Sequence, residues 1–89
     1  MEGSRHWGKR QDGALAADTF NRLVDRCDGN PPAGTIGAYR VIYEGLPEDA
    51  QFEFLVRVAG HLALRLSKDL PDSVSRAGEL MAEWFLKPR

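Results

Sequence analysis

One long amphipathic segment, residues 47–70, most constrains what this chain can fold into. It contains no proline between Pro47 and Pro71, so nothing in it interrupts a helix. On a helical wheel its apolar residues fall within an arc of roughly 160° and its titratable residues occupy the other side. The apolar set is Phe52, Leu55, Val56, Val58, Ala59, Leu62, Ala63, Leu66 and Leu70, and the titratable set is Glu53, Arg57, His61, Arg65 and Lys68. Other elements have to cover such a helix, so we expect it at the centre of the fold.

Two apolar residues of this segment depart from the pattern. Phe54 and Leu64 project among the titratable side chains, with Arg57 and His61 between them. An aromatic and an aliphatic anchor beside an arginine is the composition of a protein interface. We therefore expect Phe54, Arg57, His61 and Leu64 to contact a partner protein or a second copy of the chain. The pattern leaves an alternative open, in which a neighbouring helix buries Phe54 and Leu64 internally.

Two further helices are marked by their caps. Asp12 suits the N-cap of a helix over residues 13–28, and Gly29 stands where a terminal glycine is expected. Pro71 ends the long central helix, and a last amphipathic helix follows over about residues 73–86. Each has one apolar face to bury, so both are expected to pack on the central helix.

A shorter helix is expected between these elements. Residues 29–34 contain two adjacent prolines and cannot continue a helix, while Thr35 can cap a second helix through about Gly45. A strand over residues 39–43 is the competing interpretation, but apolar and polar residues alternate poorly there. The sequence thus predicts a small, compact all-α bundle of about four helices over residues 12–89, with the long third helix at the centre. Residues 1–11 lack periodicity and are expected to form a flexible basic arm.

The composition bounds the class of protein. The chain has 89 residues, 43% of them hydrophobic, and a formal net charge of −1. No apolar run approaches the roughly 18 residues that a membrane span requires. Cys27 is the single cysteine, so no internal disulfide is available. We expect one soluble cytoplasmic domain, and the balanced charge gives no general footprint of a nucleic-acid binder.

No residue set in the sequence indicates a reaction. Cys27 could pair with His61 as nucleophile and base, but Cys27 lies on an apolar stripe and His61 in a polar one. With His6 they also lack the spacing of a metal site. We therefore expect no catalytic residue, no cofactor and no metal, in a protein that is not an enzyme.

Residues 62–66 and 73–77 together resemble a helix-turn-helix DNA reader. The first stretch contains Ala63, and the second begins Ser-Val-Ser-Arg, as many recognition helices do. The chain departs from that pattern in a turn about one residue too long, and in Glu79 and Glu83, which would face phosphates. The resemblance implies an alternative function in DNA binding. Its contact residues would be Arg5, Lys9, Arg10, Arg65 and Arg76.

Protein association is the function that the sequence favours. Phe54, Leu64, Val41, Leu15 and Leu86 all fall outside the apolar stripes of their own helices. A domain too small to surround its longest helix leaves such side chains for a partner. We expect a small protein-binding module, an adaptor, subunit or inhibitor of a larger assembly.

Overall fold

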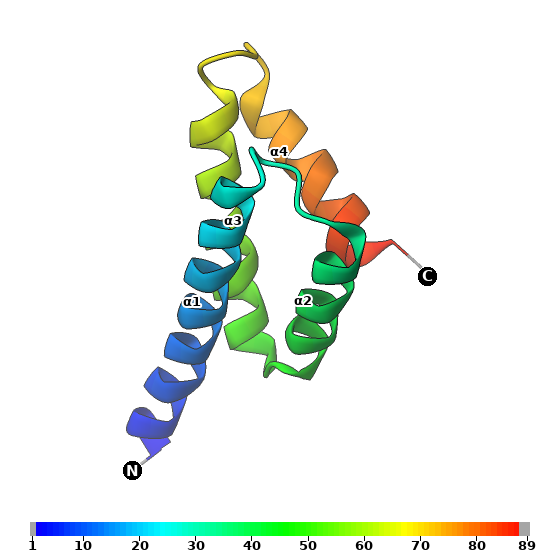
Figure 1. Ribbon diagram of the computed structural model, residues 1–89. Helices are drawn as coiled ribbons and strands as arrows, with labels where there is room; N and C mark the ends of the chain where they lie inside the picture. The colour runs from blue at the N-terminus through cyan, green and yellow to red at the C-terminus, as the bar shows by residue number, and fades with distance from the viewer. Residues whose placement is uncertain (1, 88–89) are drawn as a thin grey trace.

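The computed structural model describes residues 2–87, and side chains over residues 11–87, and this part of the chain is helical throughout apart from its connectors (Figure 1). The elements are α1 (Glu2–Arg26), α2 (Ala33–Gly45), α3 (Glu48–Leu66), α4 (Ser73–Met81) and a π-helical turn η1 (Ala82–Leu86). No strand occurs among the described residues. The predicted small all-α bundle is confirmed.

The two longest helices, α1 and α3, pack along each other and run in the same direction. Gly13 lies against Ala50 at one end of the pair, and Asp25 contacts Arg65 at the other. α2 and α4 run the opposite way and lie to one side of this pair (Figure 1). α3 contacts all three other helices, which confirms its central place. The longest helix, however, is α1, with 25 residues against 19 in α3.

The helix α1 begins well before the predicted start at Gly13. Its backbone is helical from Glu2, because no proline interrupts residues 2–26 and Asp12 lies within the helix instead of capping it. The predicted arm is therefore helical in its backbone, while the side chains of residues 2–10 lie outside the described part of the structure. Gly13 has a different role. A Cβ at this position would lie 2.1 Å from the Ala50 carbonyl oxygen, so the glycine permits the close approach of α1 and α3.

The glycine predicted to end the first helix does so. Gly29 adopts a left-handed φ of 83°, and its N–H donates to the Val24 carbonyl at 2.7 Å. Asp28 before it is also left-handed, with φ of 53°. The bond satisfies a carbonyl at the end of α1, and the two left-handed residues redirect the chain toward Pro31.

Two other helix boundaries differ from their predicted places. α2 starts at Ala33 and not at Thr35, because the Pro32 carbonyl already accepts the Ile36 N–H at 3.1 Å. α3 ends at Leu66, four residues short of Leu70, and the chain continues as a turn in which the Leu70 N–H donates to the Leu66 carbonyl at 2.8 Å.

An aromatic cluster forms the core where all four helices meet. Phe20 of α1 is fully buried, with its ring centroid 4.8 Å from that of Tyr39 on α2 and 5.3 Å from that of Phe85 on η1. Phe54 of α3 completes the cluster, 5.2 Å from Phe85. Edge-to-face pairs of this kind add about 0.5–1.5 kcal/mol each beyond area burial. The cluster fixes which face of α3 points inward.

Candidate interaction surface

The inward face of α3 is a row spaced by four residues. Ala50, Phe54 and Val58 are fully buried and Leu62 is 2% exposed. This row points about 100° away from the centre of the apolar arc on the wheel. Phe54 does project among the titratable residues, but that side of α3 faces the core. For Phe54 the alternative of internal burial therefore holds and the interface prediction was wrong, whereas Leu64 is exposed.

The helix α1 covers the titratable side of α3 through polar side-chain contacts. Arg57 lies 3.7 Å from Asp18, and His61 Nε2 and Arg65 Nη1 lie 2.9 Å and 2.5 Å from the same oxygen of Asp25. The hydrogen bond from His61 holds the pKa of the Asp25 carboxyl below its usual value. Long side chains can pack their stems against a neighbour while their charged ends stay near solvent. A polar stripe thus became a helix-packing face.

The opposite side of α3 exposes a second row spaced by four residues. We call it the outer ridge, and it consists of Glu48, Phe52, Val56, Gly60 and Leu64 of α3 and of Lys68 in the turn that follows, all of them exposed. The exposed fractions of its apolar members are 66% for Phe52, 51% for Val56 and 73% for Leu64. α3 is therefore apolar on two opposite faces, of which only one is covered.

The structure separates the residues predicted to form the partner strip. Phe54 is inaccessible, and Arg57 and His61 are engaged with α1. Leu64 lies on an open surface, in the same four-residue row as Phe52 and Val56 and not together with the predicted set. Phe52 and Val56 were missed because the wheel assigned them to the core. The available signal was the row spaced by four residues that runs from Phe52 and Val56 through Gly60 to Leu64.

Other large apolar side chains are exposed one or two to an element. They are Leu15 on α1, Val41 and Ile42 on α2, Leu70 in the α3–α4 connector, Val74 on α4 and Leu86 on η1. The expected exposure of Leu15, Val41 and Leu86 is thus confirmed. Single exposed apolar residues are ordinary on protein surfaces. The outer ridge differs because its members are aligned along one helix.

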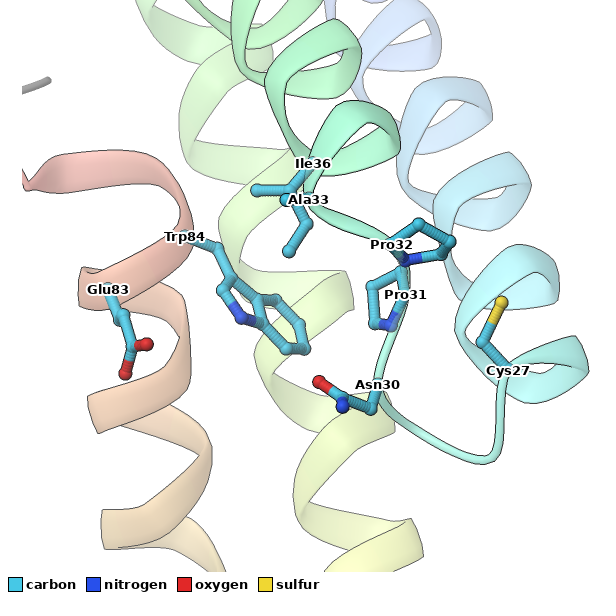
Figure 2. Close-up of a pocket in the computed structure, with 8 residues that line it drawn as sticks. All are labelled: Cys27, Asn30, Pro31, Pro32, Ala33, Ile36, Glu83 and Trp84. Atoms are coloured by element: carbon cyan, nitrogen blue, oxygen red, sulfur yellow. The ribbon is translucent and has the colours of Figure 1, made fainter.

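A hollow beside the α1–α2 connector contains the only cysteine. Figure 2 shows the Trp84 indole across from Pro31, with Asn30 below it and the Glu83 carboxylate directed away. Cys27 lines this hollow, whereas His61 bonds Asp25 on the α3 side of α1. The structure does not bring the thiol and the imidazole into contact. The pair that the sequence allowed is therefore not formed in the structure.

The residues of the DNA-binding alternative that are described are paired within the chain. Arg65 contacts Asp25, and Arg76 lies 3.1 Å from Glu79 on the same helix. Ala77 and Met81 turn the inner face of α4 into the core. Arg5, Lys9 and Arg10 belong to the residues whose side chains are not described.

Three further observations concern ligands, membranes and relatives. Over the described residues, no group of three or more His, Cys, Asp or Glu side chains is placed to hold a metal ion. None of the described helices combines the length and the apolar character needed to cross a bilayer. No protein-family model matches the chain, and no significant match was found among curated proteins or solved structures.

Proposed function

We propose that this protein is a small, non-enzymatic protein-binding module whose contact surface is the outer ridge of α3. The observation that carries the proposal is the double-faced character of this helix. One row of α3 is buried in the core, and the opposite row exposes more than half of each of Phe52, Val56 and Leu64. Covering side chains of this size stabilises an association by about 1.5–3 kcal/mol each.

The neighbourhood of the ridge supports a protein as the ligand. The apolar row lies on a regular helix that is held along one side by α1 and by α4 along another. A rigid, preorganised row of anchors loses little conformational entropy on binding. An amphipathic helix or a groove on another protein would fit such a row.

The non-enzymatic part of the proposal rests on the placement of the reactive side chains. Cys27 lies in the hollow beside Trp84, and His61 is held by Asp25. Neither therefore has the neighbour that nucleophilic catalysis requires.

The proposal is tested by exposed-site variants of the tagged full chain. Phe52→Ser and Leu64→Ser remove ridge anchors, and Val41→Ser removes a valine on α2 that is also more than half exposed. All three should melt within a few degrees of wild type, since exposed substitutions change stability by about 0.5 kcal/mol or less. Quantitative affinity capture, followed by titration of the purified partner, should show binding lost in the two ridge variants and kept in Val41→Ser. Equal binding by all three variants would refute the ridge as the contact surface.

DNA binding stays the alternative prediction. Its test is selection from a random duplex library at physiological salt. A reproducible sequence motif that Arg76→Ala weakens, with affinity falling steeply as salt rises, would favour it over the protein-binding proposal.

A further inference from the structure

We propose that the outer ridge is occupied by a second copy of this chain, with the two α3 helices crossing antiparallel. This inference rests on the proposed protein-binding function and names the partner. It follows from the order of residues along the ridge, which is self-complementary about position 58.

In such a dimer the two-fold axis passes between the two α3 helices, perpendicular to them, at the level of Val58. It pairs each ridge residue of one copy with the ridge residue of the other copy that lies equally far on the opposite side of position 58. Phe52 and Leu64 lie equally far from this level, so they meet across the axis, and Val56 likewise meets Gly60. Two-fold dimers are built in this isologous way, since each contact then occurs twice.

Size complementarity supports this register. Apart from its chain neighbours and its own helix backbone, a Cβ built at Gly60 would meet no atom within 4 Å, so open space lies above the middle of the ridge. The branched Val56 side chain of the second copy would occupy that space. Rows spaced by four residues pack against each other at a helix crossing of about −50°, which is common in globular proteins.

Charge complementarity supports the same register. Glu48 and Lys68 stand at the two ends of the ridge, also equally far from position 58, and both are exposed. In the antiparallel arrangement each Glu48 faces Lys68 of the other copy. A parallel arrangement would place like charges together, which costs affinity.

The same charges disfavour a lipid surface as the occupant. Helices that lie on membranes carry Lys and Arg beside their apolar face. Here Glu48 begins the ridge and Glu53 flanks it, while Arg57 and Arg65 are engaged by aspartates of α1.

The size of the ridge indicates a weak dimer. A standard interface buries about 800 Å² per partner, or roughly 13% of the 5966 Å² surface of this chain. A single row on one helix buries less area than that. We therefore expect a dissociation constant of about 10–100 µM.

The test is analytical ultracentrifugation of the full chain from about 5 to 500 µM, a range that brackets this constant. Wild type should pass from monomer to dimer, and Phe52→Ser and Leu64→Ser should weaken the dimer about tenfold or more, while Val41→Ser should not. Melting curves recorded alongside establish that each variant is folded.

Charge reversal tests the antiparallel register. Glu48→Lys and Lys68→Glu should each weaken self-association, because each creates like-charge pairs at both ends of the dimer. An equimolar mixture of the two variants should associate again, since every end pair then joins Lys to Glu. A dimer that forms equally well in both single variants would overturn the antiparallel register.

The remaining outcomes separate this inference from the proposed function. A chain that stays monomeric at about 500 µM overturns the dimer. If that monomer still captures a different protein through Phe52, the protein-binding function stands and only the identity of the occupant was wrong. Co-sedimentation with anionic phosphatidylserine vesicles that Phe52→Ser abolishes would overturn both.

Discussion

Replacing Gly13 by alanine should destabilise the protein, although alanine is the better helix former. The glycine lies within α1, where the new Cβ would meet the Ala50 carbonyl oxygen at 2.1 Å and its carbonyl carbon at 2.8 Å. Carbon and oxygen atoms need about 3.2 Å or more, so α1 and the first turn of α3 must separate by about 1 Å. The contact is with backbone, which cannot rotate away as a side chain can.

The magnitude follows from two opposed effects. Overpacking of this kind costs about 1–3 kcal/mol, and the gain in helix propensity from glycine to alanine returns at most about 1 kcal/mol. We expect a net loss of about 1–2 kcal/mol. In a domain of this size each kcal/mol shifts the melting temperature by about 4–8 °C, so the change should be readily measured.

Gly37→Ala is the matched control. Gly37 also lies inside a helix, α2, but a Cβ there would have no other atom within 4 Å. This variant should gain about 0.5–1 kcal/mol. Both would be measured by thermal and urea unfolding followed by circular dichroism at low protein concentration. If Gly13→Ala is as stable as wild type or more stable, the close contact of α1 with α3 is refuted.

Three further predictions concern the seam between α1 and α3 and its surroundings. Phe54→Ala should cost about 3–5 kcal/mol, whereas Leu64→Ala should change stability by about 0.5 kcal/mol or less; similar losses for both in urea unfolding would contradict their assigned faces. Asn21 is 8% exposed and its Oδ1 has no hydrogen-bond partner among the described residues, so Asn21→Leu should raise stability by up to about 1 kcal/mol, and a clear loss on melting would show that the amide is satisfied. Asp25 has a folded pKa below its ordinary 3.8, so its stabilising contribution is complete above that pH and is lost as the pH falls below it. Asp25→Asn should remove about 0.5 kcal/mol at neutral pH, a small amount because the side chain is 44% exposed. The stabilities of the two proteins should converge as the pH falls through the lowered pKa of Asp25.

The position of the helices could be predicted from local chemistry alone. Proline cannot donate a backbone hydrogen bond, so the breaks before α2 and after α3 follow from Pro31, Pro32 and Pro71 whatever surrounds them. Gly29 ends α1 because a left-handed residue there closes the last turn. The start of α1 could not be predicted in this way. Gly13 suggests a helix boundary in the sequence, whereas in the structure it makes a close contact with Ala50 in a distant segment.

The face that α3 turns inward was decided by the tertiary structure. The apolar and titratable stripes of the sequence predict which face of the helix is buried and which is exposed when the helix is considered alone. They place Phe52 inside and Phe54 outside. In the fold, Asp18 and Asp25 of α1 pair with the titratable stripe, and the core forms on that side instead. Those aspartates are more than thirty residues away in the chain, so no local pattern in α3 records them. For the same reason the candidate surface on Phe52 and Val56 emerged only once the helices were packed.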